Sequence, residues 1–102
     1  MIHIQVRVFA TLRKYLPAEF TLKIKKGTEI GKLFNLIFNR FPEAKESITS
    51  ETEKDLYSRY ILLKNGRNIV HLEKKKTILE KGDTISIFPP IGGGQLPTVS
   101  SF

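Results

Sequence analysis

The stretch that decides the fold is GTEIGKLFNLIFNRFP, residues 27–42. Its large apolar side chains recur every three or four positions, which is the spacing of one face of an amphipathic α-helix. They are Ile30, Leu33, Phe34, Ile37, Phe38 and Phe41. Thr28, after the break at Gly27, is expected to cap this helix. Pro42 is expected to end it, because the residue before a proline is disfavoured in helical conformation.

Two segments before the helix have the alternation of half-buried strands. Residues 2–8 place Ile and Val at every second position, and residues 20–24 alternate Phe, Leu and Ile with polar side chains. The Leu16-Pro17 pair between them marks a turn. These segments are therefore predicted to pair as a hairpin with a long loop.

Three further strands are predicted after the helix. Residues 60–63 and 68–70 flank Asn65-Gly66, a dipeptide that favours a type I′ hairpin turn because both residues tolerate positive φ. A last strand, residues 84–88, is expected to end at Pro89-Pro90, because proline cannot donate a hydrogen bond to a sheet.

The order of these elements predicts the fold. Residues 43–58 are mostly polar and are expected to form a connection with one short helix. A single long helix must bury its apolar stripe against one face of a sheet. We therefore expect an α+β fold of the ubiquitin-like β-grasp type, a mixed sheet with one long helix packed across one face and the last strand beside the first.

Composition limits the classes of function. The chain has 102 residues, a formal charge of +7 and no cysteine, so disulfides and cysteine nucleophiles are excluded. His3 and His71 are isolated, which argues against a metal site. The N-terminal segment lacks the apolar run of a signal peptide, so we expect no membrane association and a cytoplasmic location. The basic cluster Lys74-Lys75-Lys76 has no aromatic residue interleaved with it, so we expect a solvated face there and not a nucleic-acid patch.

Several side chains near the last strand have two interpretations. Phe88 has the opposite parity to Ile85 and Ile87, so it is expected on the sheet face away from the helix. An apolar patch there would suit docking to a partner, but residues 43–58 or the end of the chain could equally cover it. Arg13 and Lys14 could meet an acidic partner, although solvation is the simpler expectation. Asp83 is expected to bond local backbone N–H groups.

The residues after this strand give the most specific signal. Residues 79–94 read LEKGDTISIFPPIGGG. Together with VRVFATLR at residues 6–13 and LKNGR at residues 63–67, this block resembles the MoaD/ThiS family of sulfur carriers, most nearly the small subunit of molybdopterin synthase. In that family a Gly-Asp turn opens a strand that runs into Pro-Pro and a terminal Gly-Gly.

The resemblance implies a function and a set of partners. An E1-like adenylating enzyme would use ATP to activate the carboxyl group of Gly94, the second residue of the Gly93-Gly94 pair. A sulfur donor would convert it to a thiocarboxylate for the large subunit of molybdopterin synthase. The chain itself would bind no cofactor tightly and would contribute no catalytic side chain. Its partner-binding residues would be Phe88, Pro89, Pro90, Ile91 and Gly92.

One departure from the family pattern concerns the end of the chain. Eight residues, Gln95 to Phe102, follow Gly94, so no carboxyl group is available there until the Gly94–Gln95 bond is cleaved. We interpret residues 1–91 as the β-grasp domain, residues 92–94 as a glycine tail and residues 95–102 as an extension removed by a processing protease. An appended segment, or a relative without carrier chemistry, would also explain the extension.

Other functions fit the same sequence. A carrier for thiamine synthesis or tRNA thiolation and a ubiquitin-like modifier of lysines belong to the same class. A β-grasp interaction module without acyl chemistry belongs to another. A nucleic-acid binder would require an affinity that falls steeply with salt.

Overall fold

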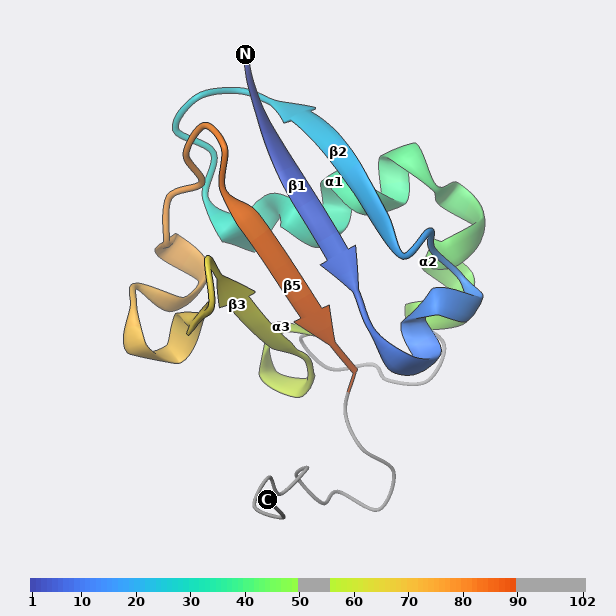
Figure 1. The fold of residues 1–102 in the computed structure, drawn as a ribbon. Helices are drawn as coiled ribbons and strands as arrows, with labels where there is room; N and C mark the ends of the chain where they lie inside the picture. The colour runs from blue at the N-terminus through green and yellow to red at the C-terminus, as the bar shows by residue number, and fades with distance from the viewer. Residues whose placement is uncertain (50–55, 90–102) are drawn as a thin grey trace.

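A computed structural model describes residues 1–49 and 56–89, which form a mixed five-stranded sheet with helices across one face (Figure 1). The strand order is β2-β1-β5-β3-β4, with β1 parallel to β5 and the other neighbouring pairs antiparallel. The strands are β1 (Ile2–Val8), β2 (Glu19–Ile24), β3 (Ile61–Lys64), β4 (Arg67–Asn68) and β5 (Thr84–Phe88). This arrangement confirms the α+β β-grasp prediction, including the last strand beside the first.

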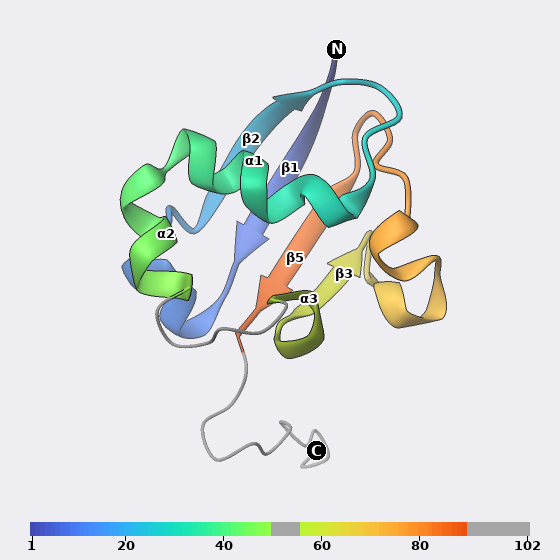
Figure 2. The same ribbon diagram turned by 180° about the vertical axis from the view of Figure 1, so that it is seen from behind.

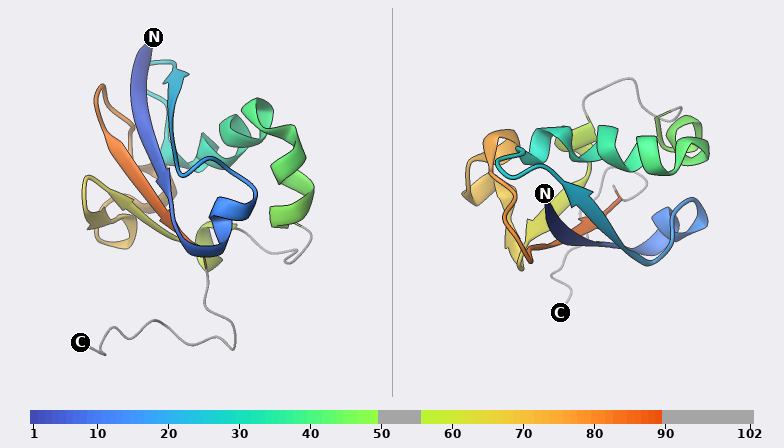
Figure 3. Two further views of the ribbon diagram at one scale, coloured as in Figure 1. Left: turned by 45° about the vertical axis from the view of Figure 1, so that its right-hand side comes forward. Right: turned by 90° about the horizontal axis from the view of Figure 1, so that it is seen from above.

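The sheet has one buried and one exposed face. In β1 the side chains of Ile4, Val6 and Val8 are buried, whereas His3 and Arg7 are exposed on the other face. β2 alternates in the same way and pairs with β1 as the predicted hairpin. The helices α1 (Leu33–Arg40) and α2 (Pro42–Thr49) lie on one side of the sheet, so the core lies between that side and α1 (Figure 3).

The long helix begins later than its apolar pattern suggested. Residues Ile30–Lys32 form a 3₁₀ turn, η2, and α1 spans Leu33–Arg40. Thr28 is not its cap, because the Thr28 hydroxyl donates to the Lys25 carbonyl at 2.6 Å and closes the preceding turn. The Phe34 N–H, one of the orphan donors of the first turn, instead donates to the Tyr57 hydroxyl at 3.0 Å.

Pro42 ends α1, as predicted, and also begins another helix. α2 spans Pro42–Thr49 and α3 spans Leu56–Arg59, so the prediction of one short helix between residues 43 and 58 was wrong. A proline is tolerated in the first turn of a helix, where its missing N–H would have no partner. Ala44 and Ile48 of α2 are buried, which anchors this helix to the core.

The turn after β3 has the predicted conformation, but its return strand is short. Asn65 and Gly66 have φ values of 51° and 88°, as a type I′ turn requires. The strand predicted for residues 68–70 stops at Asn68, because the Asn68 side chain accepts a hydrogen bond from the Val70 N–H and begins a 3₁₀ turn, η3 (Ile69–His71). A second such turn, η4 (Lys74–Lys76), packs against η2.

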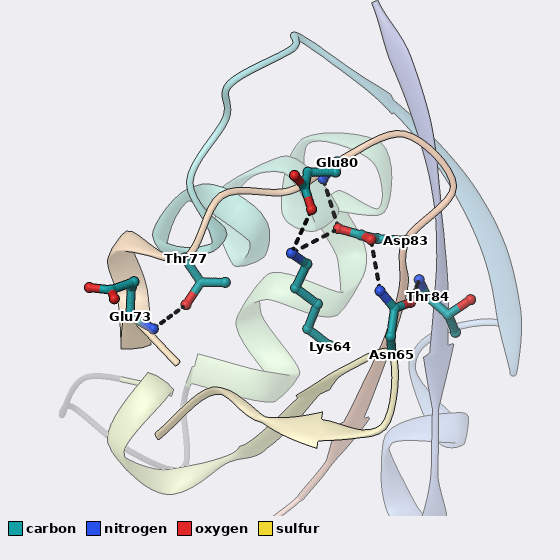
Figure 4. A network of polar contacts seen from close by, with 7 residues as sticks. All are labelled: Lys64, Asn65, Glu73, Thr77, Glu80, Asp83 and Thr84. Carbon is teal, nitrogen blue, oxygen red and sulfur yellow. Dashed lines mark hydrogen bonds and ion pairs between the residues drawn. The ribbon is translucent and has the colours of Figure 1, made fainter. Parts of the chain in front are cut away.

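A buried carboxylate fixes the turn that leads into β5 (Figure 4). Asp83 accepts hydrogen bonds from the Glu80 N–H at 2.7 Å and the Asn65 side-chain amide at 2.8 Å, and the Lys64 ammonium lies 3.5 Å away. The Asn65 side chain accepts in turn from the Thr84 N–H. Burial lowers the pKa of Lys64, but its hydrogen bond to Glu80 and the charges of Asp83 and Glu80 outweigh that effect and raise the pKa above its usual value.

Candidate functional site

The ends of β1 and β5 bring two phenylalanines together. These strands are parallel, with Val8 opposite Ile87, so their C-terminal ends lie side by side. The Phe9 N–H donates to the Ile87 carbonyl at 3.1 Å. The rings of Phe9 and Phe88 stack with centroids 4.3 Å apart and planes at 8°. Both side chains are only partly buried, so this pair is accessible on the face away from α1.

Aliphatic side chains extend this apolar area along β3. Ile61 lies opposite Phe88 in the antiparallel pair, and Leu63 lies opposite Ser86. Leu62, between them, is buried in the core, so Ile61 and Leu63 are on the outer face, where both are half-buried. Ile61 and Leu63 therefore add aliphatic area to the outer face beside Phe88.

Two arginines border the stacked rings. The guanidinium carbon of Arg13 lies 5.3 Å from the centroid of the Phe9 ring, and that of Arg7 lies 5.7 Å away. The Nε of Arg13 donates to the Val8 carbonyl at 2.9 Å, which holds this side chain in place. Arg7 is 3.8 Å from the Glu19 carboxylate, a weak contact between exposed groups. Arg13 is thus ordered against an aromatic ring.

We call the group formed by Phe9, Phe88, Ile61, Leu63, Arg7 and Arg13 the tail-base surface. It combines stacked aromatic rings, aliphatic side chains and two arginines, residue types that are enriched where proteins bind proteins. Phe88 was predicted from the sequence as a docking residue, but Phe9 was not. The same parity argument applied to Phe9, together with the parallel pairing of β1 and β5, would have found it.

Of the residues expected to bind partners, the structure describes two. Phe88 ends β5 on the outer face, and Pro89 follows it, half-buried and outside the strand. Pro90, Ile91, Gly92, Gly93 and Gly94 lie outside the described residues, as does the extension from residue 95 to residue 102. The tail-base surface is thus built around the last strand residue before this segment.

The outer face is not covered by the described part of the connection between α1 and β3. Both α2 and α3 lie on the α1 side of the sheet (Figure 2). Ala44 and Ile48 of α2 are in the core, and Leu56 and Tyr57 of α3 pack against it. Residues 42–49 and 56–59 therefore leave Phe88 accessible. For these residues, the alternative that the connection between α1 and β3 covers the apolar patch is excluded.

The remaining polar groups have structural roles. Asp83 bonds the Glu80 N–H within its own turn, which confirms the prediction made for it. Within residues 1–49 and 56–89 no three His, Asp or Glu side chains gather in a way that could hold a metal ion. No helix in the same ranges has the length and hydropathy needed to cross a membrane.

Comparison with known proteins identifies the family. The model of the ThiS family matches residues 6–94. A segment of 33 residues is 54% identical to small archaeal modifier protein 3 of Haloferax volcanii, covering 32% of this chain and 36% of that protein, so the match spans about a third of the relative's length.

Solved structures extend the likeness to the whole domain. The structure of small archaeal modifier protein 1 from Methanosarcina acetivorans has a TM-score of 0.71 at 31% identity, covering 92% of this chain and 98% of that one. A structure from Pyrococcus furiosus, assigned as subunit 1 of a molybdopterin converting factor, has a TM-score of 0.68 at 22% identity, covering 89% and 100%. The chain belongs to the ThiS family of ubiquitin-like sulfur carriers and modifiers.

Proposed function

We propose that this chain is a sulfur carrier for molybdopterin synthesis, activated at Gly94 once residues 95–102 have been removed. The observation that carries the proposal is the tail-base surface, which lies at the C-terminal end of β5 in a chain whose family match continues in sequence through Gly94. Such a surface can hold the domain on a partner while the following residues reach into the partner's active site.

The proposed chemistry takes place on the Gly94 carboxyl group. Hydrolysis of the Gly94–Gln95 bond would first expose a carboxylate. A carboxylate resists nucleophilic attack, so an E1-like enzyme would transfer AMP from ATP to it and release pyrophosphate. The terminal sulfur of a persulfide donor would then attack the acyl carbon and displace AMP. A thiol would reduce the resulting disulfide and leave a Gly94 thiocarboxylate.

The domain would contribute binding and not catalysis. Its side chains at the tail-base surface supply apolar area through Phe9 and Phe88 and two positive charges through Arg7 and Arg13. The adenylating enzyme and the large synthase subunit would use the same surface in turn, because both must receive the same tail. Each would need an apolar patch with acidic residues at its edge.

A ubiquitin-like modifier that forms isopeptide bonds with lysines is the second candidate. It is favoured by the two most identical proteins described above, both of which are small archaeal modifier proteins. The two candidates share the acyl-adenylate of Gly94 and differ in the nucleophile that follows, a sulfur atom or a lysine amine.

A reconstitution separates the candidates. A chain ending at Gly94 is incubated with ATP, the cognate adenylating enzyme and a sulfur donor, then with the large synthase subunit and the pterin precursor. The proposal predicts a thiocarboxylate by intact mass and sulfur transfer to the pterin. Isopeptide-linked lysine products without transfer to the pterin would favour the modifier instead. A β-grasp module without acyl chemistry would give neither product.

Substitutions test the tail-base surface in the same assay. Phe88→Ser and Arg13→Glu are expected to lower the rate of adenylation at limiting carrier concentration by at least about tenfold, since centrally placed aromatic and arginine side chains carry most of the affinity of an interface. Val70→Ser and Lys14→Glu are matched controls, because both residues are exposed and lie outside the surface. Equal losses in the controls would contradict the assignment.

A further inference from the structure

A groove lies at the end of the domain away from the tail-base surface. It has a volume of about 610 Å³ and is lined where the end of β2, the following loop and the start of α1 meet. Ile24 and Leu36 are its aliphatic side chains within the fold, and Met1, which is 70% exposed, adds a third. Gly27, in the loop, leaves the space beside its Cα open.

The rim of this groove is positively charged. Lys23, Lys25 and Lys32 line it and are all exposed, and Glu29 is the one acidic residue among the lining side chains. Within residues 1–49 and 56–89, none of these three lysines has an ion-pair partner. Their aliphatic stems add apolar area to the groove, while their ammonium groups stay in water.

We propose that this groove is a docking site for an acidic amphipathic segment of another protein. Aliphatic side chains of the segment would occupy the groove between Ile24 and Leu36, and its carboxylates would meet the lysines. A nucleic acid fits less well, because no aromatic ring lines the groove to stack on a base and Glu29 would repel phosphates.

The position of the groove gives the proposal its consequence. Ile24 pairs with Ile2 at one end of β1, and Ile87 pairs with Val8 at the other. At about 3.3 Å per residue these ends are roughly 20 Å apart. A partner in the groove therefore leaves Phe9 and Phe88 free, so one protein can hold the domain while another receives its tail.

The test is a titration of the ¹⁵N-labelled full chain with a synthetic helical peptide that carries leucines on one face and glutamates beside them. The amide signals of the residues that line the groove are expected to change their chemical shifts, and those of Phe9 and Phe88 are expected to stay unchanged. Lys25→Glu with Lys32→Glu is expected to weaken binding by about tenfold or more, because two attractions become repulsions. Lys14→Glu with Lys76→Glu carries the same charge change outside the groove and is expected to weaken it less than about threefold.

A further substitution tests the apolar part. Leu36→Ala is expected to weaken peptide binding severalfold. The NMR spectrum of this variant is expected to show that the domain is still folded. The proposal would be overturned if millimolar peptide changed no amide chemical shifts, or changed only those of residues outside the groove. Equal losses of peptide affinity in the two double variants would also overturn it. Tighter binding of single-stranded oligothymidylate, lost in the Lys25/Lys32 variant, would overturn it in favour of nucleic acid.

Discussion

Asp83 offers the sharpest test of how the turn before β5 is held. In the Asp83→Ala variant the Glu80 N–H and the Asn65 side-chain amide lose their hydrogen-bond acceptor. The Lys64 ammonium group loses one of the two carboxylates that it contacts. Asn65 is exposed and can bond water instead. The Lys64 side chain, which is 16% exposed, keeps only Glu80.

The magnitude follows from these contacts. Hydrogen bonds to a charged group contribute about 1.5–3 kcal/mol each, and Asn65 recovers part of its loss from water. We therefore expect Asp83→Ala to lower the free energy of unfolding by about 2–4 kcal/mol. For a domain of this size that is a fall in Tm on the order of 10–30 °C. Asp83→Asn, which keeps an acceptor but not the charge, is expected to cost roughly half as much.

The control is Glu80, the other residue whose carboxylate contacts the Lys64 ammonium group. Glu80 lies closer to the ammonium, at 3.0 Å, than Asp83 does at 3.5 Å, but its side chain is 69% exposed against 7% for Asp83. An exposed ion pair contributes under about 1 kcal/mol, so Glu80→Ala is expected to change Tm little. Urea and thermal unfolding followed by circular dichroism measure both variants. If Glu80→Ala lowered the free energy of unfolding as much as Asp83→Ala does, it would refute the reasoning that the buried carboxylate contributes more stability than the exposed one.

Three further predictions concern packing, capping and pH. Gly31→Ala is expected to destabilise the domain by about 0.5–1 kcal/mol, because the new Cβ would lie 3.1 Å from the Lys75 carbonyl oxygen and the strain of moving η4 would exceed the gain from replacing glycine; a raised Tm would show that η4 moves aside without strain. Tyr57→Phe is expected to cost about 0.5–1.5 kcal/mol through the lost hydrogen bond to the Phe34 N–H; urea unfolding measures it, and no loss would exclude that role. Because the pKa of folded Lys64 is raised, its stabilisation is present below the unfolded value of about 10.4 and disappears as pH rises through the folded value. The gap in stability between wild type and Lys64→Met should therefore stay constant up to about pH 10 and narrow above about pH 10.4, and a gap that widens there would contradict the assignment.

The sequence predicted the elements whose pattern is set by local periodicity. The stripe of α1, the alternation of β1 and β5 and the Asn65-Gly66 turn all follow from the spacing of residues along the chain. These features identify the fold because a helix with one apolar face and strands with one apolar face have few ways to pack.

Two of the errors concern a side chain that can form either of two alternative hydrogen bonds. Thr28 could cap a helix or close a turn, and it closes the turn with Lys25. Asn68 could continue a strand or begin a 3₁₀ turn, and it binds the Val70 N–H. The partner of Phe34 is Tyr57, 23 residues later in the chain, a distance over which local pattern carries no information.

The candidate site was predicted in part for a related reason. Parity placed Phe88 outside the core, and the structure agrees. The stacking of Phe88 on Phe9 depends on the parallel pairing of β1 and β5, two strands that are far apart in the sequence. The arginines beside Phe9 are its neighbours in the sequence, Arg7 in β1 and Arg13 in the turn η1 (Ala10–Lys14).

The central claim is that Gly94 becomes a free carboxyl group and carries sulfur. Intact mass spectrometry of the protein purified from its own cells tests it most directly. The account predicts a species that ends at Gly94, part of which has one oxygen replaced by sulfur. Full-length chain alone, with no ATP-dependent labelling of the trimmed chain by the cognate adenylating enzyme, would contradict it.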